Sequence, residues 1–100
     1  MADELQLARA VSEAVLATEG VYSLGAGRYA EAATYGAGEK VTGVVVGSDD
    51  VRVHIVARYP LVEPIPALAE RIREQVASEV EGRTTTVVVE DLEVAQDEGL

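Results

Sequence analysis

Residues 41–59 read VTGVVVGSDDVRVHIVARY, and this stretch predicts two β-strands folded back on each other. In its second half, from Val51 onward, apolar or aromatic residues hold the odd positions and polar residues hold the even positions, with Val56 as the exception. Successive side chains of a strand point to opposite faces of a sheet, so the odd positions are expected to face a core. The first half carries valine at both parities, and the GSDD between the halves has the composition of a tight turn.

The composition around this hairpin is that of one small domain. One hundred residues, 48% of them hydrophobic, are enough to bury a core. We expect the domain to span residues 1–95 and a frayed acidic tail to follow at 96–100. Phe, Trp and Cys are absent, so the core must be aliphatic and neither disulfides nor thiolate metal sites can form.

The charge balance disfavours two classes of partner. Eighteen acidic residues against eight basic ones give a formal charge of −10, which repels nucleic-acid phosphates and anionic lipid surfaces. No apolar run approaches the roughly 20 residues that span a bilayer, and the first residues lack the positive charge of a signal peptide. We therefore expect a cytoplasmic protein without direct membrane insertion.

Two segments have the spacing of amphipathic helices. The first runs from about Glu4 to Glu19, and Gly20 supplies a stop. The second begins near Glu63-Pro64, where proline suits a first turn, and ends at Gly82. The apolar positions of the second helix are Ile65, Leu68, Ala69, Ile72, Val76 and Val80.

Three further segments complete the chain. Residues 21–24 predict a short strand, and residues 25–39, GAGRYAEAATYGAGE, predict a loop that holds one helical turn near 30–34. Residues 84–89 are β-branched throughout, as a sheet strand prefers. The apolar parity changes after Val89, which predicts a bulge near Glu90-Asp91.

The predicted order is α-β-β-β-α-β, which indicates an α+β fold. A right-handed crossover would lay the last strand parallel to residues 51–59, with both helices on one face of a small mixed sheet. This arrangement is a two-layer sandwich whose other face is free and apolar enough to bind a partner. The residues predicted for that interaction face are Val44, Val46, Arg52, His54, Val56, Arg58 and Val88, with Thr86 beside them.

Candidate chemical motifs are few. Residues 25–30, GAGRYA, match G-x-G-x-x-A, but another glycine-rich segment follows where a nucleotide site needs a helix. Asp49-Asp50 is followed by no calcium-loop pattern. No serine, carboxylate or second histidine stands at a spacing that would make His54 a catalytic base or a metal ligand. We therefore predict no catalytic, metal or cofactor residues. A small nucleotide- or metal-dependent enzyme remains an alternative.

The order of elements also allows a K-homology-like nucleic-acid-binding module. Such modules clamp the nucleic-acid backbone with a G-x-x-G loop between two helices. No G-x-x-G occurs in this chain, and its net charge opposes RNA. Nucleic-acid binding is the second alternative.

Taken together, several pieces of the sequence resemble the alkaline shock protein family of bacterial general-stress and cell-envelope-stress proteins. The likeness spans nearly the whole chain and lies in the order and spacing of the pieces. They are Ala17 to Val21 with Leu24, Gly43 to Val46, the strand to Tyr59-Pro60, Ile65 through Gln75-Val76 to Gly82, and Val87 to Leu92.

The resemblance implies a non-enzymatic interaction or scaffold protein of the stress response. It implies self-association as a homo-oligomer, and a protein partner that includes a separate membrane-spanning anchor. The protein would then lie in the cytoplasm, at the inner face of the membrane through that partner. The resemblance brings no catalytic residues and no cofactor.

Overall fold

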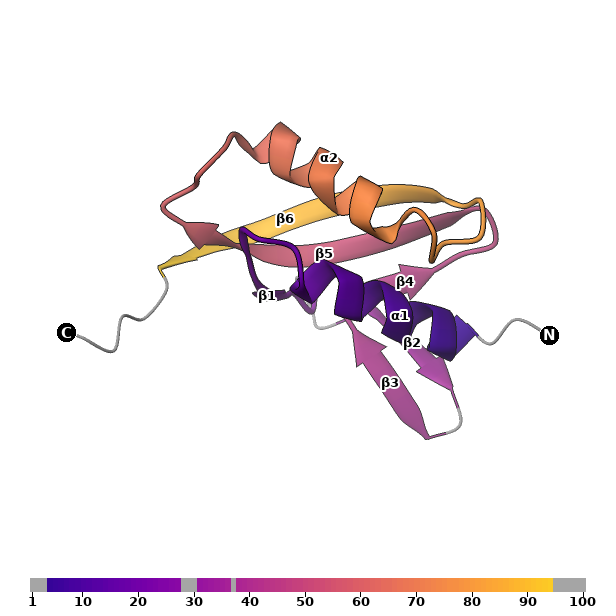
Figure 1. Cartoon of the computed structure of the whole chain (residues 1–100). Helices are drawn as coiled ribbons and strands as arrows, with labels where there is room; N and C mark the ends of the chain where they lie inside the picture. Colours follow the sequence, from indigo (N-terminus) through magenta and orange to yellow (C-terminus); the bar gives the residue numbers. More distant parts are fainter. Residues whose placement is uncertain (1–3, 28–30, 37, 95–100) are drawn as a thin grey trace.

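The long strand β5 (Asp50–Tyr59) lies at the centre of the fold (Figure 1). The structure is a computed structural model that describes residues 4–27, 31–36 and 38–94. The expected tail at 96–100 lies outside the described residues. One edge of β5 pairs in parallel with β6 (Thr84–Val94), as the crossover argument predicted.

The other edge of β5 pairs antiparallel with two short strands placed one after the other. They are β4 (Val44–Val46) and β1 (Val21–Leu24). The predicted hairpin is confirmed as β4 and β5, and a hydrogen bond of 2.7 Å from Gly47 N to Asp50 O closes its turn. The sheet is therefore mixed, as predicted.

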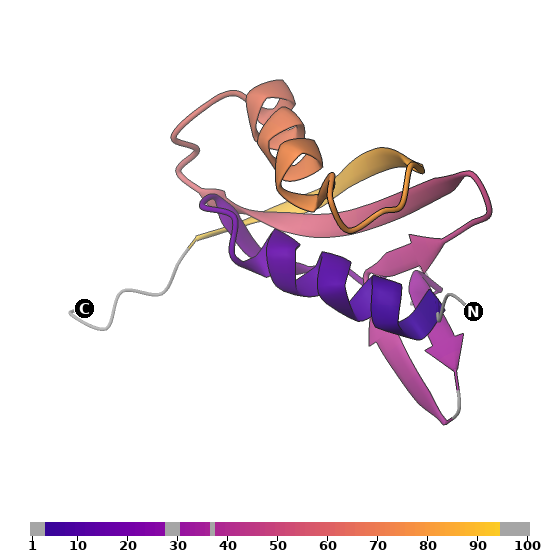
Figure 2. The ribbon, with the colours of Figure 1, turned by 45° about the vertical axis from the view of Figure 1, so that its right-hand side comes forward.

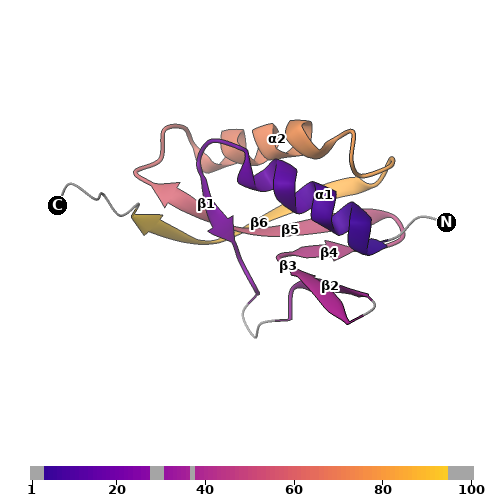
Figure 3. The same cartoon turned by 60° about the horizontal axis from the view of Figure 1, so that its bottom comes forward.

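Both helices cover one face of this sheet, so the two-layer α+β sandwich is confirmed. Helix α1 (Glu4–Leu16) packs on β1 and β4, and helix α2 (Ile65–Val76) packs on β6 and on α1. Figure 3 shows the two helices side by side above the strands. Each regular helix ends earlier than its periodicity predicted, but Val80, in the turns after α2, is still buried.

The core between the layers is aliphatic, as the composition required. Alternate residues of β5 point into it, which confirms the odd-position prediction from Val51 to Ala57. The largest fully buried side chains are Ile55, Leu68, Ile72, Val11, Val15, Val44, Val51, Val53 and Val76.

A second, two-stranded sheet stands where the sequence predicted a loop with a helical turn. It consists of β2 (Ala33–Gly36) and β3 (Glu39–Thr42), which project from the main sheet beside α1 (Figure 2). The helical-turn prediction is wrong at the described positions because Thr34 ties β2 to β4. Its hydroxyl donates to Val44 O at 2.6 Å and accepts from Val46 N at 3.2 Å.

The predicted bulge in the last strand is confirmed. Val89 lies opposite Ile55, whereas the next residue of β5, Val56, lies opposite Asp91. Glu90 is therefore the extra residue in β6. An extra residue of this kind bends the strand and changes the direction in which its own side chain points.

The predicted position of Val44 and Val46 on the free face of the sheet is wrong. Val44 lies opposite Val53 and is 0% exposed, and Val46 lies opposite Val51 and packs against the core. Valines at both parities could not reveal which set faces inward. The turn at Gly47 fixed the register, and a shift of one residue would exchange the faces.

The helices of the described part of the chain are both short. Neither is long and apolar enough to cross a membrane.

Candidate functional site

The candidate site is the face of the sheet opposite the helices, which we call the open face. It consists of Arg52, His54, Val56 and Arg58 on β5, Thr86 and Val88 on β6, and Val45 on β4. The two arginines and Thr86 are exposed, and the three valines are half-buried. The structure therefore brings together five of the seven predicted interaction residues and places the other two, Val44 and Val46, on the helix side.

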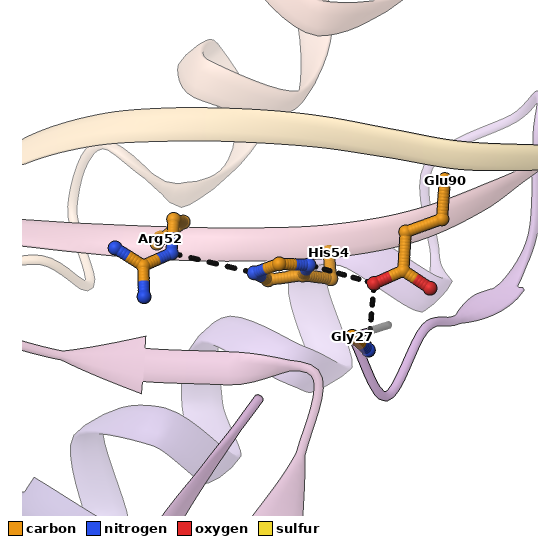
Figure 4. Close-up of polar contacts among 4 residues, drawn as sticks. All are labelled: Gly27, Arg52, His54 and Glu90. Atoms are coloured by element: carbon orange, nitrogen blue, oxygen red, sulfur yellow. Dashed lines mark hydrogen bonds and ion pairs between the residues drawn. The ribbon is translucent and has the colours of Figure 1, made fainter. Parts of the chain in front are cut away.

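His54 departs from the rest of this face because it is buried, with only 9% of the residue exposed. Its Nδ1 lies 2.7 Å from Glu90 Oε2, and Arg52 Nε donates to its Nε2 at 3.3 Å. Figure 4 shows the three side chains in line along the open face. An arginine nitrogen can only donate, so Nε2 is the accepting nitrogen and the proton of the neutral ring lies on Nδ1.

The chain's own loop covers part of the open face at this point. Gly27 N donates to Glu90 Oε2 at 2.7 Å, and Gly25 N donates to His54 O at 2.7 Å. A Cβ on Gly25 would lie 2.6 Å from the Glu90 carboxyl carbon, so a larger residue there would displace the Glu90 carboxylate from this position. The expectation of a wholly free face is thus corrected, because residues 25–27 lie over His54.

Next to this covered region the open face is hollowed. Val56 and Val88 supply apolar surface, and the carboxylates of Glu90 and Asp91 give the wall a negative charge. The full lining is Glu31, His54, Val56, Val88, Glu90 and Asp91. A hollow of this kind suits the stem and charged head of a long basic side chain, since such side chains lay their methylenes on apolar surface.

The far end of the open face carries an aromatic and a cation together. The guanidinium carbon of Arg58 lies 5.7 Å from the centre of the Tyr22 ring, a cation–π distance. Tyr22 is 39% exposed, so the pair offers a flat surface to solvent. Tyrosine and arginine are the residue types that contribute most at protein interfaces.

The geometry does not assemble a reacting group at His54. Both ring nitrogens are engaged by neighbours within the chain, so neither is positioned as a base toward a substrate. Among residues 4–27, 31–36 and 38–94, no group of three or more His, Asp or Glu side chains is placed to hold a metal ion.

The partners of His54 were not found from the sequence. Glu90 is 36 residues away, and the sequence signal was the parity change that predicted the bulge. The glycines of the G-x-G segment match a phosphate-binding pattern in the sequence, but in the structure they bring the loop against Glu90.

A second hollow lies at the other end of the molecule and has a structural role. It is a cleft of about 60 Å³ between the α1–β1 turn and residues 60–63. Arg71 links two of the residues that line it, because it donates to Glu63 Oε2 and, at 2.6 Å, to Glu19 O. The hydrogen bond that Arg71 donates to Glu63 raises the pKa of the Arg71 guanidinium.

No family model, curated protein or solved structure matches the chain significantly.

Proposed function

We propose that this protein is a non-enzymatic interaction module of the general-stress or cell-envelope-stress type, which binds a partner protein through its open face. One observation carries the proposal: both helices of the described residues cover one face of the sheet, while the other face presents Val56 and Val88 beside the exposed Arg58. An apolar surface rimmed by charges is typical of protein-binding sites.

The driving force is burial of the half-exposed valines of the open face. Completing the burial of such a side chain contributes up to about 1.5 kcal/mol, before the costs of association are subtracted. Val45, Val56 and Val88 together are a small apolar area, so the proposal requires contributions from the charged groups around them.

Those charges favour a partner that carries both signs. Exposed Arg52 and Arg58 would pair with acidic groups of the partner at the rim. The hollow beside Glu90 and Asp91 would take a lysine or arginine side chain. Charge complementarity of this kind also sets the orientation and the rate of association.

The resemblance to the alkaline shock protein family supports a proposal for the cellular location of this module. In that setting the protein works in the cytoplasm, and a separate membrane-spanning partner holds it at the inner face of the membrane. The sheet surface, and not a helix of this chain, would make that attachment.

The test is capture of partners with Val56→Glu, which puts a charge in the middle of the open face. We expect the partner retained by the wild type to be lost, because the carboxylate is desolvated beside Glu90 and Val88. The measurement is quantitative affinity capture from host cells, followed by binding of the purified partner.

Val62→Glu is the matched control. Val62 is 75% exposed on the loop before α2 and is not one of the open-face residues. The control should keep the partner, and circular dichroism should show both variants folded. Equal capture by wild type and both variants would remove the open face as the binding surface.

A further inference from the structure

The outer edge of β6 is the longest unpaired strand edge in the described part of the chain. β6 has eleven residues and pairs with β5 along one edge, while no described strand pairs with its other edge. Such an edge presents a row of N–H and C=O groups that can pair with another strand.

Two hydrogen bonds show which residues of β6 direct their backbone N–H and C=O groups to the outer edge. Thr84 N donates to Asp49 O at 3.0 Å, on the β5 side. Thr85 O accepts from Arg73 Nε at 3.2 Å, away from that side. Backbone groups alternate in direction along a strand, so the N–H and C=O groups of Val87 and Val89 also point to the outer edge. The side chains of these two valines pack against the core.

The flat part of β6, residues 84–89, carries no charged side chain. Residues 84–89 read TTTVVV, which is β-branched throughout and lacks the lysine, proline or acidic residue that commonly protects an edge. The acidic residues begin at Glu90, where the bulge ends the flat part of the strand.

We infer that this edge joins two copies of the chain, with β6 paired antiparallel to its counterpart about a two-fold axis at Val87. In this register Val87 faces Val87 of the second copy, and Thr85 faces Val89. No like charges oppose each other, whereas an axis moved to Glu90 would bring carboxylates together.

The helix layer beside the edge is compatible with a second copy. Arg73 and Glu70 of α2 form an ion pair at 3.0 Å next to β6, so the border carries both signs of charge. Two such borders meeting on a two-fold axis are self-complementary, as an isologous contact requires.

Arg73 does not block the edge permanently. A carbonyl oxygen has two acceptor positions, so Thr85 O can accept from the second copy while Arg73 stays. The Arg73 side chain is also 43% exposed and can move into solvent.

The dimer would place both open faces on the same side, because a two-fold axis through a sheet edge continues the sheet without turning it over. This consequence rests on the proposed function: a dimer would bind a partner that has two sites with added avidity. The dimer itself does not depend on the open face.

The experiment uses Val87→Cys in the full chain, which contains no other cysteine. Val87 is half-buried on the helix side of the sheet, and its counterpart would lie directly across the axis, so we expect a short bis-maleimide to link the two cysteines into a covalent dimer. Leu92→Cys is the control: it is more accessible, with 42% of the residue exposed, but lies off the axis. It should give several-fold less dimer.

Light scattering of the wild type across the micromolar range completes the test. A mass of twice the chain, with preferential linkage at Val87→Cys, supports the inference. A wild type that stays monomeric, or linkage at Leu92→Cys that equals linkage at Val87→Cys, overturns it. Val56→Glu should leave the dimer mass unchanged, so failure of the open face and failure of the edge are distinguishable.

Discussion

At the scale of the single residue, Gly43 determines where the chain leaves the main sheet. It stands between β3 and β4 with φ +92°, and its carbonyl accepts from His54 N at 2.8 Å. A Cβ at this position would lie 2.7 Å from Leu24 Cβ and 2.9 Å from Gly25 O. Neither neighbour is the end of a flexible side chain, so both the backbone conformation and the close packing require glycine.

We expect Gly43→Ala to destabilise the protein by roughly 2–4 kcal/mol, from left-handed strain plus overpacking. Gly38→Ala separates the two effects, because Gly38 has φ +82° and nothing within 4 Å of the added Cβ. The control should cost about 1–2 kcal/mol. Urea unfolding of both variants measures the difference, and equal losses would show that packing against Leu24 contributes nothing.

At the scale of the element, the bulge in β6 has a defined consequence. It turns Glu90 toward the open face, where one carboxylate oxygen meets both His54 Nδ1 and Gly27 N at 2.7 Å. One acidic side chain thus joins two strands and a loop. The side chain is 22% exposed, so these bonds are partly shielded from water.

Glu90→Ala is expected to destabilise the protein by about 1–3 kcal/mol, because it leaves His54 and Gly27 with unpaired donors. Glu90→Gln keeps an acceptor oxygen and should cost less. Glu93→Ala, an exposed carboxylate on the same strand, should change the free energy of unfolding by no more than about 0.5 kcal/mol. Denaturant titration of the three variants is the measurement, and a neutral Glu90→Ala would contradict the proposed link.

At the scale of the whole molecule, the formal charge of −10 acts on every association. Two copies repel each other at long range, and salt reduces this repulsion because the screening length falls from about 30 Å at 0.01 M to about 8 Å at 0.15 M. A dimer held mainly by backbone pairing gains little from the exposed charges at its border, so the reduced repulsion dominates.

We therefore expect the dissociation constant of the dimer to decrease several-fold between these two ionic strengths. Sedimentation equilibrium at both salt concentrations measures it. A dimer that weakens with salt would instead indicate that opposite charges, and not the β6 edge, hold the copies together.

The sequence was most informative where structure depends on neighbouring residues. The period of two in β5, the helical spacing of α2 and the glycine-aspartate turn are local patterns, and each was confirmed. The bulge near Glu90 was also predicted, since a change of parity within one strand needs no knowledge of its partner.

The sequence was least informative where a position depends on a distant segment. The strands β2 and β3 form because α1 and β4 lie against them, and a segment rich in glycine does not reveal that support. Val44 and Val46 were placed on the wrong face for a similar reason, since valine is compatible with either face and only pairing with β5 decides.

By itself the sequence determined the class of the fold, the aliphatic core and the parallel last strand, because these follow from periodicity, composition and the handedness of crossovers. Only the tertiary structure decided which valines remain on the open face, that His54 is enclosed by Glu90 and a distant glycine loop, and that no described strand pairs with the outer edge of β6. The physical reason is that burial and strand pairing are properties of two segments together, and neither segment encodes the register in which they meet.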